Sequence, residues 1–300
     1  MGWYEEIRRR AEEAFASGDV STALALFEQA ERRARSEGDA ETADLAYCNR
    51  AAILVDLERG AGCVPHLKQI LMRSRTPRVR WMASYTTAMA AYMESSLEEA
   101  ASWARRAERY AGELDDPVHR AATSNLEGNI AVLLSRFDEA EEAYRRALET
   151  FDLRSDPHGR TMAAQIRDNL GYVHLCTDRI PDGIVLCEAA RRELEAWDAT
   201  HLLPQTLQDL CYGYLLDSRL EPARSHGERG LTLALETDDR LVVKNSLFLL
   251  AEVAVRQRDR FRARRYLSEL VRCYPEVAPD EEIIDVFLDM DLTRVVNLRG

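Results

Sequence analysis

Apolar residues recur along nearly the whole chain at spacings of three and four, which is the period of an α-helix with one buried face. The alternation typical of a strand appears only in the short stretch TRVVNL, residues 293–298. Pro77, Pro117 and Pro157 each follow a threonine or an aspartate, and this order is typical of an N-cap followed by the first helical residue. The pattern therefore predicts an all-α chain, with helices of roughly 14 to 20 residues joined by short connections.

A row of small and large residues marks the buried face of these helices. In RFDEAEEAYRRALETF, residues 136–151, Ala140, Tyr144 and Ala147 are four and three positions apart and so share one helical face. The row follows a small reference residue, Gly128, by 12, 16 and 19 positions. Rows with the same spacing, some with other residues in place of alanine or tyrosine, follow seven small reference residues that are 37 to 43 positions apart. These reference residues are Ala11, Ala51, Ala88, Gly128, Gly171, Cys211 and Ala251. Small residues let helices approach closely, so the spacing predicts a close contact inside each of seven tandem helical hairpins.

Two of these stretches resemble a known repeat. GNIAVLLSRFDEAEEAYRRAL (128–148) and NLGYVHLCTDRIPDGIVLCEAA (169–190) are similar to the tetratricopeptide repeat (TPR), in which a small residue precedes a row of alanine, ring and alanine. The resemblance covers about residues 3–275. It implies a right-handed superhelical solenoid of seven antiparallel hairpins, each with a helix A and a helix B. The period of about 40 departs from the usual 34 of the family, the Leu-Gly pair survives only at Leu170-Gly171, and the signature tryptophan is missing.

The predicted domain organisation follows from the repeats. Residues 1–278 form the TPR-like solenoid, and residues 279–300 form a capping helix and a C-terminal tail. The last repeat of a solenoid needs a helix with one polar face. The stretch PDEEIIDVFLDMDL places apolar residues on one helical face and acidic residues on the other; the apolar residues are Ile283, Ile284, Phe287 and Leu288. The final stretch TRVVNLRG is expected to be loosely held.

Composition and motifs exclude several classes of function. The net charge is −12 and the basic residues are spread evenly, which argues against nucleic acid as a partner. No apolar run of 18 residues is present, so no membrane partner is expected, and the start of the chain has no signal-peptide pattern. The six cysteines include no CxxC pair and indicate reduced thiols in a cytoplasmic protein. HExxH, P-loop and GxGxxG motifs are absent, so we expect no catalytic residues, no metal site and no cofactor.

The resemblance also implies where a ligand binds. In TPR proteins the A helices line a concave groove, and ligands contact a few recurring positions on them. Carried onto this chain, those positions hold ten candidate peptide-binding residues: Asn49, Tyr85, Asn125, Asn129, Asp168, Asn169, Tyr172, Gln208, Asp209 and Tyr212. Asparagine is unfavourable inside a helix, but its amide offers both a donor and an acceptor to a peptide backbone. We hypothesise that the amides hold an extended segment while the tyrosines supply flat contact area; the alternative is that these residues only solvate an inner face.

The charges at these positions indicate the kind of partner. Family members that hold a peptide's C-terminal carboxylate use lysine and arginine, whereas Asp168 and Asp209 stand in the central repeats here. A neutral or basic partner segment is therefore favoured over an acidic one. We further expect the candidate side chains of repeats four to six to be partly exposed and free of structural hydrogen bonds; they are Asn125, Asn129, Asn169, Tyr172, Asp209 and Tyr212.

Two functional hypotheses follow. The leading one is a non-catalytic adaptor or scaffold that binds a partner peptide segment in its concave groove. The alternative is a peptide-sensing regulatory solenoid that controls a transcription factor or effector, similar to the peptide-receptor repeat proteins of bacteria. An enzyme has no supporting pattern in the sequence.

Overall fold

The computed structural model describes residues 2–57, 59–114, 116–151, 157–274 and 282–299. Within these residues the chain is all-helical, with fifteen α-helices, three short 3-10 helices and no strand. The all-α prediction is therefore confirmed. The chain divides into two compact units, Met1–Leu134 (unit 1) and Ser135–Gly300 (unit 2), which we describe separately.

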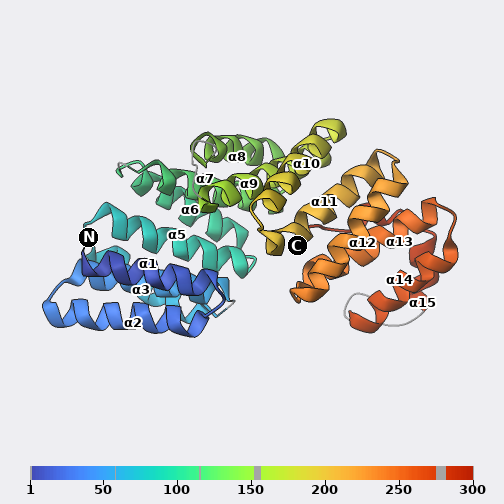
Figure 1. Ribbon diagram of the computed structural model, residues 1–300. Coiled ribbons are helices and arrows are strands. Elements are labelled where there is room, and N and C mark those ends of the chain that lie inside the picture. Colours follow the sequence, from blue (N-terminus) through green and yellow to red (C-terminus); the bar gives the residue numbers. More distant parts are fainter. Residues whose placement is uncertain (1, 58, 115, 152–156, 275–281, 300) are drawn as a thin grey trace. The chain divides into compact units, whose positions relative to one another are not determined.

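The helices of both units follow one another as sequential pairs (Figure 1). Unit 1 contains α1 (Trp3–Ala16), α2 (Val20–Glu37), α3 (Ala40–Asp56), α4 (Val64–Arg73), α5 (Pro77–Met93), α6 (Leu97–Ala111) and α7 (Pro117–Leu133). Unit 2 contains α8 (Phe137–Phe151), α9 (Pro157–Cys176), α10 (Ile180–Ala196), α11 (Leu203–Leu216), α12 (Leu220–Glu236), α13 (Arg240–Arg256), α14 (Arg260–Cys273) and α15 (Glu282–Leu288). The short helices are η1 (Ala61–Cys63), η2 (Thr200–Leu202) and η3 (Leu292–Arg294). Taken in order along the chain, the first fourteen α-helices alternate as helix A and helix B of the seven repeats expected from the sequence, and α15 follows them.

The small reference residues and their rows lie where the sequence places them, in the packed interior. All seven reference residues and every residue of their seven rows are buried. In the fifth repeat, a Cβ on Gly171 of α9 would lie 2.6 Å from the Cys187 sulfur and 3.0 Å from the Gly183 carbonyl oxygen of α10. In the sixth, a Cβ on Gly227 of α12 would lie 2.9 Å from the Cys211 sulfur of α11. These distances leave no room for another carbon atom, so small residues at these positions set how closely helices A and B approach.

A left-handed residue closes the turn from helix A to helix B. The seventh position after the reference residue has a positive φ in every repeat where that position is described: Gly18, Ser95, Ser135, Asp178, Ser218 and Arg258, with φ between 56° and 82°. A single residue in this conformation lets a tight connection reverse the chain direction. The same spacing that positions the helix contacts therefore positions the turns as well.

The capping helix is shorter than predicted but buries the expected face. Helix α15 presents Ile284, Phe287 and Leu288 to the end of unit 2, and all three are buried. The Phe287 ring meets Phe248 of α13 edge to face at 5.3 Å between ring centroids. Residues 279–281, where the sequence places the start of this helix, and the predicted N-cap Asp156 lie outside the described residues.

We expect Ala223→Leu or Ala140→Leu to lower the free energy of unfolding by about 1–3 kcal/mol, because the added carbons overpack a close contact. Both alanines are 0% exposed. Chemical denaturation of each variant measures the change. An unchanged midpoint for either variant would mean that the reference spacing does not mark the helix contacts.

Candidate functional site

Four of the ten candidate residues lie in unit 1, and Asn49 and Tyr85 make contacts within the fold. Asn49 of α3 is half-buried, and its amide nitrogen donates to the Tyr4 hydroxyl at 2.9 Å and to the Leu45 carbonyl at 3.0 Å. The Tyr85 ring of α5 stacks on Trp81 at 5.2 Å between centroids, and burial raises its pKa to about 12. Asn49 therefore ties α3 to α1, and Tyr85 packs along its own helix.

The other two unit 1 candidates, Asn125 and Asn129, project from α7. Both are half-buried, as expected from the sequence. The amide oxygen of Asn125 is itself buried and has no hydrogen-bond partner among the described residues. A ligand that brings a donor to this helix would find an acceptor there.

The remaining six candidates lie on two neighbouring A helices of unit 2. Helix α9 carries Asp168, Asn169 and Tyr172, and helix α11 carries Gln208, Asp209 and Tyr212. Asn169 and Tyr212 are partly exposed, as expected. The expectation of exposure is wrong for Tyr172 and Asp209, which are 8% and 0% exposed.

Arg299, near the end of the chain, contacts both of these buried residues. Its guanidinium makes two hydrogen bonds to the Asp209 carboxylate, one from Nη1 to Oδ1 at 3.0 Å and one from Nη2 to Oδ2. Its central carbon lies 4.1 Å from the centre of the Tyr172 ring. Nη2 also approaches the Asn169 amide oxygen at 3.5 Å. The Gln205 amide faces the same group and accepts from Nη1 and Nη2 at 3.3 and 3.2 Å when its oxygen is turned toward them.

The segment that carries Arg299 is held against the A helices of unit 2. We call residues 291–299 the tail, and Figure 1 shows the chain after α15 running back to α11. The backbone N–H of Leu292 donates to Glu252 of α13 at 3.0 Å, and the Asn245 amide of α13 donates to the carbonyl of Asn297 at 3.2 Å. The side chains of Leu292 and Leu298 are buried. The expectation of a loosely held tail is therefore wrong, because specific contacts fix it to α13, α11 and α9.

The electrostatics of this arrangement depend on one cation facing two buried carboxyl groups. Burial raises the pKa of Asp168 to about 8, neighbouring Asp209 adds to the rise, and Arg299 opposes it. Burial also raises the pKa of Asp209, again against the effect of Arg299. Burial disfavours the charged form of Arg299, but the attraction of Asp209 outweighs the effect of burial, so the pKa of Arg299 is raised. Asp209 accepts both hydrogen bonds from the Arg299 guanidinium. We therefore assign the negative charge to Asp209 and a proton at pH 7 to Asp168.

The described residues also contain potential metal ligands and thiols. No cluster of three or more metal-ligating side chains occurs among them. The Cys187 thiol is buried beside the Asp168 backbone carbonyl, and burial raises its pKa well above the ordinary value, which keeps it protonated and unreactive. All six cysteines are free. Among the described helices, none combines the length and apolar character that crossing a membrane requires.

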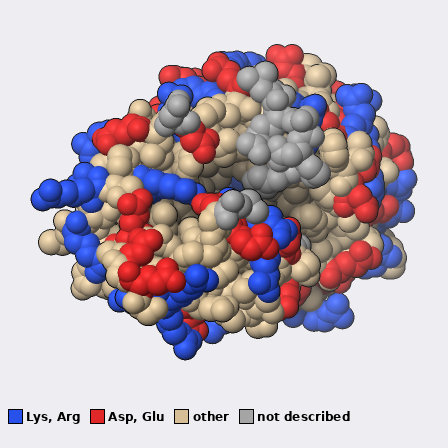
Figure 2. Space-filling view, turned by 60° about the vertical axis from the view of Figure 1, so that its left-hand side comes forward, with Lys and Arg blue, Asp and Glu red and all other residues tan. Residues whose placement is uncertain are grey.

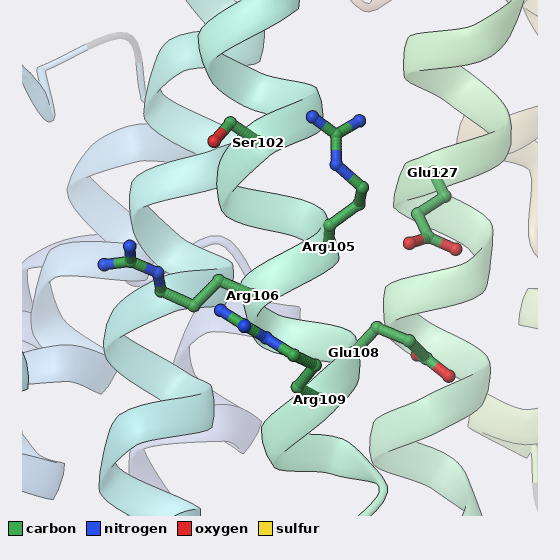
Figure 3. Close-up of a pocket in the computed structure, with 6 residues that line it drawn as sticks. All are labelled: Ser102, Arg105, Arg106, Glu108, Arg109 and Glu127. Atoms are coloured by element: carbon green, nitrogen blue, oxygen red, sulfur yellow. The ribbon is translucent and has the colours of Figure 1, made fainter.

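A separate hollow lies between α6 and α7 of unit 1 (Figure 3). It encloses about 480 Å³ and is lined by Ser102, Arg105, Arg106, Glu108, Arg109 and Glu127. Arg105 of α6 and Glu127 of α7 lie on the side where the two helices face each other, while Arg106 points away from α7. The arginines are exposed, and no candidate residue lines this hollow. Figure 2 shows acidic and basic side chains interspersed over one face of the molecule, as on an ordinary solvated surface.

Sequence reasoning missed three residues of the unit 2 site: Gln205, Asn245 and Arg299. Gln205 and Asn245 stand six positions before the reference residues Cys211 and Ala251, so extending the recurring positions by one helical turn would have found both. Nothing in the spacing pointed to Arg299, because it lies beyond the repeats.

No protein-family model matches this chain, and no curated protein matches it in sequence. Its fold is similar to that of several solved structures. A Rap protein complexed with competence and sporulation factor is 10% identical, with 95% of this chain and 80% of that chain covered and a TM-score of 0.71. NprR in complex with its cognate peptide NprX is 14% identical, with coverages of 95% and 81% and a TM-score of 0.67. A tetratricopeptide repeat protein from Parabacteroides merdae is 12% identical, with coverages of 97% and 98% and a TM-score of 0.56. In fold, the chain is thus a TPR-like repeat protein.

Proposed function

We propose that this chain is a peptide-sensing regulatory solenoid, in which the A helices α9, α11 and α13 of unit 2 bind an extended peptide segment of a partner. One observation carries the proposal: a segment of the chain itself, the tail, lies against these three helices. It contacts positions that the TPR resemblance assigns to ligand binding, among them Asn169, Tyr172 and Asp209. The tail therefore serves as an internal example of the kind of ligand that this surface accepts.

The contacts of the tail are of two kinds. Asn245 recognises a backbone carbonyl, and such a contact is independent of the sequence of the bound segment. Asp209 and Tyr172 recognise a cationic side chain, and this contact selects the segment by its charge. A partner segment that offers an extended backbone and a basic side chain satisfies both.

The comparisons favour a sensor over a passive adaptor. Two of the similar structures hold a peptide or a competence and sporulation factor, and NprX is described as the cognate peptide of NprR. A TPR solenoid responds to a ligand that binds one curvature better than another, because each repeat contacts only its neighbours. Small-angle scattering with and without bound peptide distinguishes the two functions: a changed profile supports the sensor, and an unchanged profile at saturation supports the adaptor.

We expect Asn169→Ala and Asn245→Ala each to weaken peptide binding by about 0.5–1.5 kcal/mol, because each removes a hydrogen-bonding amide at the site. Selection from a displayed library of random ten-residue peptides supplies the ligand, and fluorescence anisotropy measures its affinity. Gln257→Ala is the control, since Gln257 lies just after α13 and donates to Glu221 at 2.8 Å. If the double asparagine variant binds the selected peptide as tightly as the wild type, the peptide binds elsewhere on the chain.

A further inference from the structure

The surroundings of Arg299 have the form of a receptor for a guanidinium group. One carboxylate pairs with the two terminal nitrogens, an aromatic ring covers the planar face, and the Asn169 amide oxygen approaches from the side. This set matches the shape and charge of arginine and would fit lysine less well, because an ammonium group cannot bridge both carboxylate oxygens and stack at the same time. The Asp209 side chain is 0% exposed and that of Arg299 is 11% exposed, so the contact is largely shielded from water.

Most of the tail between its two buried leucines is exposed. Leu292 and Leu298 are buried, whereas Arg294, Val295 and Asn297 are exposed. Arg294 pairs with Asp291 at 3.4 Å, and its side chain is 85% exposed. Detaching the tail from Leu298 onward would therefore uncover one leucine and one arginine without breaking any helix.

A vacated site would still attract a cation. Without Arg299, the buried carboxylate of Asp209 and its neighbour Asp168 would face water or a new partner, and Asp168 Oδ1 already has no hydrogen-bond partner among the described residues. A buried carboxylate without a counter-charge is unfavourable, and this favours replacement of one guanidinium by another over an empty site.

We propose that Arg299 is a built-in competitor: the Asp209–Tyr172–Asn169 site binds an arginine side chain of a partner segment, and the tail fills that site until the partner displaces it. This inference rests on the proposed function, because it names the ligand group and the regulation of the same surface. A competitor that fills the site in about nine of ten molecules weakens the apparent affinity for any other ligand about tenfold. The tail therefore sets a threshold concentration for the partner.

The test uses the tail sequence itself as the probe. A labelled peptide with the sequence of residues 292–299, acetyl-LTRVVNLR-amide, is titrated into the wild type, Arg299→Ala and Arg294→Ala, and fluorescence anisotropy reports binding. We expect Arg299→Ala to bind the probe about tenfold more tightly than the wild type. Arg294→Ala is the matched control, because it removes an arginine of the same tail that lies outside the site, and it should bind like the wild type. Adding Asp209→Asn to Arg299→Ala should abolish the gain.

Three results would overturn the proposal. They are equal affinities of the probe for the wild type and Arg299→Ala, the same gain in Arg294→Ala, and a gain that survives Asp209→Asn. Circular dichroism checks that each variant folds. If Arg299→Ala loses helicity, Arg299→Gln is used in its place. Glutamine keeps much of the length of the side chain but has neither the positive charge nor the paired terminal nitrogens of arginine.

The library peptide of the preceding section separates this inference from the proposed function. If no library peptide binds while the probe shows the expected gain, the competitor is supported and the proposed function fails. If a library peptide binds the wild type and Arg299→Ala equally, the proposed function stands and the competitor is refuted.

Discussion

Replacing Tyr144 by alanine is expected to lower the free energy of unfolding by about 3–5 kcal/mol, the range for removing a large buried ring. Tyr144 is 1% exposed and lies between Ala140 and Ala147, which are both 0% exposed. Helix α8, which carries all three residues, packs against α9. Backbones held in helices cannot move in to fill the space, so most of the cavity should remain, and equilibrium denaturation in urea measures the loss.

Tyr144→Phe is the control for this experiment. It keeps the ring and removes only the hydroxyl, so its effect should be a small part of the alanine effect if packing dominates. A loss in Tyr144→Phe that equals the loss in Tyr144→Ala would show that the hydroxyl, and not the packing of the ring, accounts for the stability that Tyr144 contributes.

The second large effect is expected at Glu141, next to the same row. Its carboxylate accepts from Arg179 Nη1 at 2.8 Å and Nη2 at 2.7 Å, pairs with Arg145, and lies 3.3 Å from His174 Nε2. These groups belong to α8, α9 and the start of α10, so one carboxylate joins three helices. We expect Glu141→Gln to lower the free energy of unfolding at pH 7 by about 2–3 kcal/mol, somewhat less than for a completely buried pair, because both arginines reach solvent.

The effect of Glu141 should depend on pH in a defined direction. The hydrogen bonds from Arg179 lower the pKa of Glu141 from 4.5 to about 2, against the opposing effect of burial. A carboxyl group with a lowered pKa in the folded state stabilises the fold above its unfolded pKa, and that contribution is lost as pH falls toward the folded pKa. The difference between wild type and Glu141→Gln should therefore be constant above about pH 5.5 and shrink between about pH 4.5 and pH 2.

Glu142→Gln provides the matched control. Glu142 is the next residue on the same helix and pairs with Arg146 at 3.0 Å, but its side chain is 76% exposed. Its removal should leave the unfolding midpoint almost unchanged at every pH, because water screens an exposed pair. If both glutamine variants lose the same stability, general surface charge and not the buried carboxylate would be responsible.

The sequence by itself determined the helical hairpins of this protein. Each reference residue and its row are separated by 12 to 19 positions, so the contact between Gly171 and Cys187 follows from helix period and residue size alone. The turns follow for the same reason, since Ser218 and Arg258 hold the same position relative to Cys211 and Ala251. Local periodicity is sufficient because each hairpin packs within itself and against its neighbours.

Only the tertiary structure decided the state of the candidate site. The sequence placed Asp168, Asn169 and Tyr172 on one A helix and Gln208, Asp209 and Tyr212 on the next, but it predicted an open surface and a free tail. The contacts of Arg299 with Asp209 and Asn169 join residues 90 and 130 positions apart. Arg299 lies beyond the repeats, so these contacts are not part of the repeat pattern. The physical reason is that a charge pair needs only proximity and desolvation, which leave no periodic signal in a sequence. The pairing of Arg299 with the buried carboxylate of Asp209 is therefore visible only in the folded chain.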